Sequence, residues 1–167
     1  MNQDYKNNRS ERYEKPISEF SEKVVQIKRV SKKTKGGNQF GFSILMVVGD
    51  KKGRVGVGLG KAPDVLAGIK KAIRRAKKNL FTVNLKGTTI PHDIRVKFGA
   101  AKLLLKPAPP GSGIIAGGAV RAVMEVAGIN DVSSKVLGTR NKASNVYATI
   151  KALKLLENRE SKPKETK

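Results

Sequence analysis

The chain has 167 residues, with 35 Lys and Arg against 13 Asp and Glu, so its formal net charge is +22. This length allows one ordinary domain or two small ones, and the absence of cysteine excludes disulfides and thiolate metal sites. No apolar run is long enough to predict a membrane span. So large a positive charge is typical of nucleic-acid binding, because each neutralised phosphate releases a counterion. An anionic membrane is the less favoured partner, because the chain has no Trp and only 5% aromatic residues to anchor it.

The first half of the chain predicts three strands and a helix. Residues 1–18 are polar and charged, and we expect a flexible basic arm there. The next stretch begins as a strand and ends in a basic loop, Arg29–Gly37, after which alternating apolar residues from Phe40 to Val48 predict a second strand. A turn and a third strand follow, and Asp64 is placed to cap a helix whose apolar stripe runs to Leu80.

The second half predicts more strands and two helices. Strands are expected around 81–85, 94–98, 101–106 and 131–138, with helices over 115–127 and from Asn141 onward. Gly128 is expected to end the first of these helices. The order β-β-β-α, then β-β-β-α-β-α, predicts an α+β fold of two small domains, 19–82 and 83–157, with a disordered tail over 158–167.

The stretch GRVGVGLGK, residues 53–61, admits a phosphate loop or a strand. The phosphate-loop motif needs a hydroxyl after Gly-Lys, where this chain has Ala62, and the dinucleotide motif needs a third glycine, where it has Lys61. As a strand, Gly56, Gly58 and Gly60 leave one face without side chains, which suggests close approach by another backbone. Either the chain's own helix or sheet packs there, or an RNA backbone lies there, and the sequence leaves both open.

A second glycine-rich stretch, PPGSGIIAGGAVR, precedes the helix at 115–127. It loosely resembles the phosphate loop of the galactokinase and homoserine kinase family, but Ile114, Ile115 and Gly117 stand where small hydroxyl residues would hold phosphate. The favoured interpretation is a tight loop packed on a neighbour. We therefore predict no catalytic residues, no metal ligands and no cofactor: His92 is the sole histidine, and Glu125 is expected to pair with Arg121 one helical turn away.

Four segments carry a family resemblance: RVSKKTKGG, VVGDKKGRVGVGLGKA, KPAPPGSGIIAGGAVRAVMEVAGINDV and LGTRN. In order and spacing they resemble bacterial small-subunit ribosomal protein number five, over about residues 20–155. The resemblance implies a double-stranded-RNA-binding-like first domain that binds rRNA. It implies a second domain with a left-handed crossover that contacts rRNA and neighbouring ribosomal proteins. It also implies a cytoplasmic, non-enzymatic component of the small ribosomal subunit that binds 16S rRNA. Such proteins lie between head and body where mRNA enters, contact proteins number four and eight, and influence translational accuracy.

Charge and resemblance together select the candidate sites. The expected rRNA-binding residues are Arg29, Ser31, Lys32, Lys33, Lys35, Gly36, Gly37, Lys51, Lys52, Arg54, Gly56, Gly58 and Lys61. The expected protein interface comprises Gly111, Gly113 and Arg121. Two other classes stay open: a double-stranded-RNA binder outside the ribosome, which has no need of the second glycine-rich stretch, and a kinase, for which acidic and hydroxyl residues are missing.

Overall fold

The computed structural model describes residues 19–156, so the predictions for the arm at 1–18 and the tail at 158–167 lie outside it. Its strands are β1 (Ser21–Thr34), β2 (Gly37–Gly49), β3 (Arg54–Ala62), β4 (Phe81–Thr82), β5 (Ile94–Phe98), β6 (Ala101–Pro107), β7 (Ile114–Ile115) and β8 (Val132–Leu137). Its helices are α1 (Val65–Lys78), α2 (Gly118–Ala127) and α3 (Lys142–Lys154). The α+β prediction is confirmed.

The first sheet has the order β1-β2-β3-β4, and every neighbouring pair is antiparallel. Alternation along β2 places Ile44 and Met46 on the face toward α1, where Ala72 completes a small buried cluster. The Asp64 side chain accepts from the amides of Leu66 and Ala67, so the predicted helix cap is confirmed. Helix α1 therefore covers one face of this sheet.

The second sheet has the order β5-β6-β8-β7, with β7 parallel to β8. The prediction of a strand at 81–85 in this half is wrong, since Phe81–Thr82 is shorter and pairs with β3 of the first sheet. Helix α2 begins at Gly118 and not at Ile115, because Ile114 and Ile115 pair with β8. Gly128 ends α2 in a left-handed conformation as predicted. The handedness of the β7-α2-β8 crossover stays a prediction.

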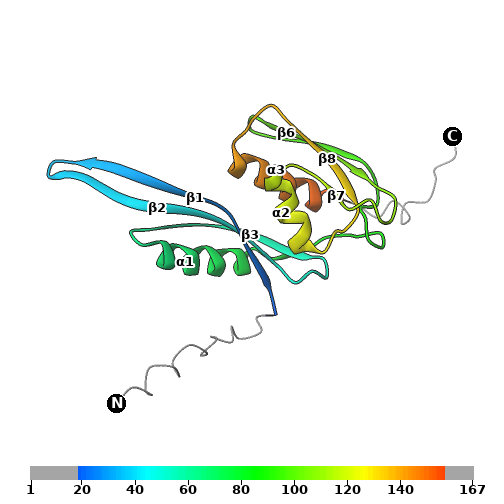
Figure 1. Ribbon diagram of the computed structural model, residues 1–167, viewed down its shortest axis with the longest axis horizontal. Coiled ribbons are helices and arrows are strands. Elements are labelled where there is room, and N and C mark those ends of the chain that lie inside the picture. The colour runs from blue at the N-terminus through cyan, green and yellow to red at the C-terminus, as the bar shows by residue number, and fades with distance from the viewer. Residues whose placement is uncertain (1–18, 157–167) are drawn as a thin grey trace, which may run out of the picture.

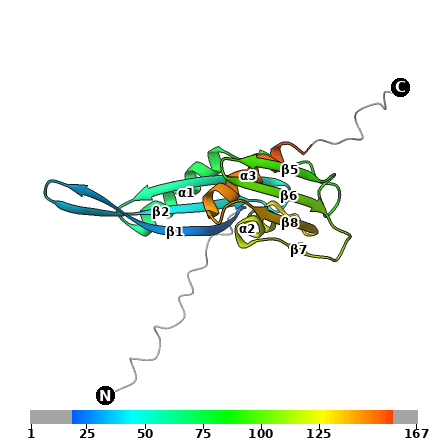
Figure 2. The ribbon, with the colours of Figure 1, turned by 90° about the horizontal axis from the view of Figure 1, so that it is seen from above.

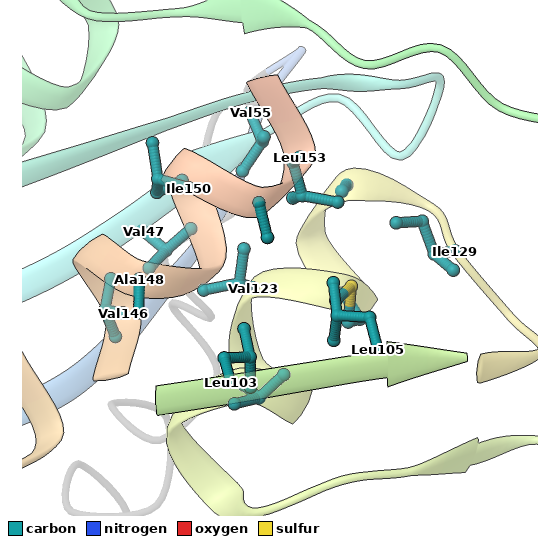
Figure 3. Close-up of a cluster of buried hydrophobic side chains, with 14 of the residues drawn as sticks. Val47, Val55, Leu103, Leu105, Val123, Ile129, Val146, Ala148, Ile150 and Leu153 are labelled. Atoms are coloured by element: carbon teal, nitrogen blue, oxygen red, sulfur yellow. The ribbon is translucent and has the colours of Figure 1, made fainter. Parts of the chain in front are cut away.

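Helices α2 and α3 lie between the two sheets, so the layers run from α1 through the first sheet and this helix pair to the second sheet (Figure 1). Seen from above, β5, β6, β8 and β7 lie side by side in that order (Figure 2). Figure 3 shows the interior of this arrangement. Val47 and Val55 of the first sheet, Val123 of α2, Leu153 of α3 and Leu105 of the second sheet are all buried in one cluster. Both sheets thus share the larger core, and the domain boundary at residue 82 stays a prediction. Within residues 19–156, no helix is long and apolar enough to cross a membrane.

Candidate nucleic-acid interface

The hairpin formed by β1 and β2 extends from the body of the molecule. The register of β2 with β3 ends at the pair Phe42–Ala62, while β1 and β2 stay paired as far as Thr34 and Gly37. The hairpin therefore projects beyond the rest of the first sheet (Figure 1). Every residue from 27 to 40 is exposed. The predicted loop at Arg29–Gly37 is wrong in its secondary structure: strand pairing continues almost to the tip, and only Lys35 and Gly36 form the turn.

This hairpin carries cations on both faces. Cross-strand partners share a face, so Arg29, Ser31 and Lys33 lie on the side of Phe40 and α1, while Lys28 and Lys32 lie on the other side. The guanidinium of Arg29 lies 3.9 Å from the centroid of the Phe40 ring, which is 49% exposed. An exposed aromatic ring with an arginine stacked on it can also receive an unstacked base.

A hollow of about 480 Å³ lies where β3 ends beside the hairpin. It brings together three of the predicted residues, Ser31, Lys32 and Lys61, and places them beside Phe40. Lys28 and Phe40 were missing from the sequence prediction. The strand register is the signal that identifies them. Ser43 of β2 pairs with both Lys28 and Lys61, and Ser31 pairs with Phe40.

Helix α1 adds a second basic surface. Arg75 and Lys71 bind the sheet, donating to the carbonyls of Leu59 at 2.8 Å and Lys61 at 3.3 Å. Other cations of α1 face away from the sheet. Together with Ile73 they line another hollow of about 480 Å³, and they are Lys70, Arg74, Lys77 and Lys78. Residues 23–78 hold 16 basic residues against the two acids Asp50 and Asp64. The hairpin and α1 together thus form a strongly positive surface, here called the basic surface of the first sheet.

The glycine face of β3 is not part of that surface. A Cβ at Gly56, Gly58 or Gly60 would overlap the backbone carbonyls of Ala76, Ala72 and Gly68, respectively. The close approach predicted from these glycines is therefore made by α1, and Gly56 and Gly58 are buried beneath it. The alternative with RNA on this face, and with it the choice of these two glycines as rRNA contacts, is wrong because the helix occupies the space.

Three further predicted residues lie at the opposite end of β2. Lys51 and Lys52 belong to the turn between β2 and β3 and Arg54 begins β3, about 40 Å along the strand from the hairpin tip. The Asp50 carboxylate shapes this turn by accepting from the amides of Lys52 and Arg54 at 2.8 and 3.0 Å and from Arg54 Nε at 2.6 Å. Burial works against ionisation of Asp50, but these donors outweigh it and lower its pKa to about 2.

The same turn joins the two halves of the molecule. The amides of Lys51 and Gly53 donate to the carbonyls of Val126 and Ala127, at 3.1 and 2.9 Å, in the last turn of α2. Lys51 adopts a positive φ of 59° to make this contact. Since helix C-terminal carbonyls lack partners within the helix, the turn caps α2. Arg54 is held by Asp50, while the side chains of Lys51 and Lys52 remain exposed.

The glycine-rich loop before α2 is held by an internal carboxylate. Asp131, 4% exposed, accepts from the Gly113 amide at 3.0 Å. Its pKa is lowered, first by a hydrogen bond from the Thr88 side chain and then by the amides of the loop. A phosphate would have to displace this carboxylate, so the loop does not resemble a kinase site in its chemistry.

Arg121 and Glu125 do not pair as predicted. The Arg121 guanidinium donates to the Ile114 carbonyl at 2.8 Å, and Glu125 pairs instead with Lys23 at the start of β1. The local pairing is wrong because each side chain reaches a partner on a neighbouring element. Gly111 remains exposed at the tip of the loop, with a positive φ of 87°.

Comparison with protein families covers both halves of the chain. Residues 20–84 match the model described as the N-terminal domain of ribosomal protein S5, and residues 96–166 match that of the C-terminal domain of ribosomal protein S5. This family is a non-enzymatic constituent of the small ribosomal subunit in the cytoplasm, where it binds rRNA. The basic surface of the first sheet fits rRNA binding, and the loop that Asp131 occupies fits a protein without kinase activity. With both family models matched, the chain belongs to the ribosomal protein S5 family.

Proposed function

We propose that the chain binds 16S rRNA through the basic surface of the first sheet and stabilises the geometry of head and body where mRNA enters the subunit. The observation that carries this proposal is the exposed hairpin, whose cations lie on both faces around Phe40. A two-stranded arm of this kind can enter a groove or junction of RNA and contact phosphates on either side. Exposure of Phe40 adds a stacking surface for one base.

The test is the salt dependence of binding to a small-subunit rRNA fragment. The triple variant Lys32→Gln, Lys33→Gln, Lys35→Gln should bind more weakly, and its salt slope should fall by about three, one for each lost phosphate contact. A matched control removes three exposed cations of the second half: Arg140→Gln, Lys142→Gln, Lys154→Gln. If hairpin and control variants lose equal affinity, net charge and not the hairpin determines binding, and the proposal fails.

We further propose that the loop around Gly111 and Gly113, with Arg121 behind it, contacts ribosomal protein number four and contributes to translational accuracy. Protein number eight is the second expected neighbour. The loop supports this proposal because its tip is exposed while its base is held by two hydrogen bonds. The Gly113 amide donates to Asp131, and Arg121 donates to the Ile114 carbonyl. A fixed, exposed loop is suited to a protein contact that has to open and close.

The corresponding experiment uses a stop-codon readthrough reporter. A side chain at Gly111 meets no atom within 4 Å but strains the positive φ, and Arg121→Leu frees the Ile114 carbonyl. Gly111→Arg and Arg121→Leu should therefore raise readthrough while subunits still assemble and rRNA affinity is retained. Arg140→Leu, at an exposed arginine of the same half, is the control. Wild-type readthrough with full incorporation of the variants would exclude this loop from the accuracy role.

A further inference from the structure

The second sheet has one face that no other part of residues 19–156 covers. Its inner residues, such as Val96, Leu103 and Leu105, are buried against α2 and α3. The alternate residues point away from the helices and form what is here called the outer sheet face: Arg95, Lys97, Lys102, Leu104, Lys106, Ile115, Ser133, Lys135 and Leu137. Five of these nine are cations, and β5, β6, β7 and β8 contain no Asp or Glu.

Strand register packs these charges together. Arg95, Leu104 and Lys135 form one row across three strands, and Lys97, Lys102 and Leu137 form the next. Lys97 and Lys102 are direct cross-strand partners, an arrangement in which like charges destabilise a sheet. None of the ion pairs in the described part of the chain includes one of the five cations. The outer sheet face thus carries a repulsion that a polyanion would relieve.

The residues of the outer sheet face indicate which partner fits it. Four of its five cations are lysines, and lysine is depleted at the cores of protein–protein interfaces, so a second protein is the less suitable occupant. The outer sheet face also has no aromatic residue, because Phe98 points to the other side and packs on Tyr147 with ring centroids 5.7 Å apart. Single-stranded bases are usually bound by stacking on aromatic rings, so this face is suited to phosphates and sugars rather than to bases.

We propose that the outer sheet face is a second RNA-contact surface, which binds the sugar–phosphate backbone of a helical rRNA segment. This rests on the proposed rRNA binding but uses a site separate from the basic surface of the first sheet. The cationic rows span about 10 Å across the strands, and Lys102 and Lys106 are about 13 Å apart along β6. Between them Leu104 and Leu137 line a shallow hollow of about 330 Å³, where sugar carbons can pack.

The experiment compares two double variants of the full chain on a helical small-subunit rRNA fragment. Lys102→Gln, Lys135→Gln removes two cations from the outer sheet face, and Arg140→Gln, Lys142→Gln removes two exposed cations elsewhere in the same half. The first variant should lower the salt slope by about two, while the control keeps the wild-type slope. The control should keep the wild-type unfolding midpoint, and the midpoint of the first variant should not fall below it, because Lys102→Gln removes the repulsion with Lys97. In the complex, Lys102 and Lys135 should be protected from acetylation, and Lys142 should not.

Each outcome separates this inference from the proposed function. Equal slopes for the two double variants, or unprotected Lys102 and Lys135, would overturn the second surface. If the hairpin triple variant still loses affinity in that case, rRNA binding by the first sheet stands. Unchanged binding by the hairpin triple variant would reject the proposed function. Protection of Lys102 and Lys135 by an acidic protein but not by RNA would reassign the face to a protein partner.

Discussion

At the scale of single residues, carboxylates in this very basic protein mainly organise backbone. Asp50 and Asp131 each bind amides of a tight turn or loop, and Glu125 pairs with a lysine of another element. An ionised carboxylate gains from backbone donors that would otherwise be unpaired, and this stabilises the β2–β3 turn and the loop before α2. The scarce acids therefore fix the shape of loops and leave most cations free for phosphate.

The Asp50 turn predicts a specific pH dependence of stability. The pKa of Asp50 is about 2 in the folded protein against an ordinary value of 3.8, so its contribution is complete above pH 3.8 and is lost as the pH falls through about 2. Asp50→Asn removes the ionisable group and with it this contribution. Urea unfolding at intervals from pH 5 to pH 2 should show wild type more stable than the variant at pH 5, with the difference shrinking toward pH 2. Parallel curves for the two proteins would show that Asp50 does not stabilise the turn through its charge.

At the scale of elements, the backbone of helix α1 packs directly on the glycine face of β3. Only glycine allows a helix backbone to approach a strand so closely, because a Cβ added to the β3 glycines would overlap carbonyl oxygens of α1. The pattern of small residues on the helix, Gly68, Ala72 and Ala76, matches that of the glycines on the strand.

Gly58→Ala tests this packing. The added Cβ has to displace the backbone at Ala72, and overpacking of a buried contact costs about 1–3 kcal/mol of unfolding free energy. Gly36→Ala is the control, because a Cβ there meets no atom within 4 Å. Chemical denaturation should show the loss for Gly58→Ala alone. Equal stability of both variants would mean that α1 can move away from the strand at little cost.

Local rules predicted the elements well but could not predict their neighbours. Alternation identified β2, and Asp64 and Gly128 identified helix ends, since each of these signals acts within a few residues. The extent of the hairpin was missed because Gly36 and Gly37 suggested a loop, whereas pairing with β2 holds the basic stretch in a strand. Likewise the bare glycine face was found from sequence, but its occupant depended on the path of a helix that follows it.

The same limit applies to the candidate site. Composition was enough to predict nucleic-acid binding and the basic character of the hairpin. It could not separate Lys32 and Lys61, which line one hollow, from Lys51 and Lys52 at the far end of β2. The outer sheet face was also missed, because its five cations are dispersed in sequence and gather only through the register of three strands.

At the scale of the whole molecule, the two sheets are joined by one interior. Val47 and Val55 reach α2 and α3 from one side, and Leu103 and Leu105 reach them from the other (Figure 3). The β2–β3 turn caps α2, and Lys23 pairs with Glu125 across the same junction. Because these contacts join the two sheets, we expect the junction to fix the position of the hairpin relative to the outer sheet face. Two RNA-binding surfaces would then hold a constant geometry.

The shared interior predicts that both halves unfold together. Leu105→Ala empties space in the core between the sheets and should cost about 2–5 kcal/mol, lowering the temperature of a single calorimetric transition. Val47→Ala, from the other sheet, should shift that same transition, because both side chains stabilise one core. Leu137→Ala, at a leucine that is 48% exposed on the outer sheet face, should change stability by no more than about 0.5 kcal/mol. Two separate transitions, of which Leu105→Ala shifts one and Val47→Ala the other, would show that the halves fold independently and that their relative orientation is set by the ribosome and not by the chain.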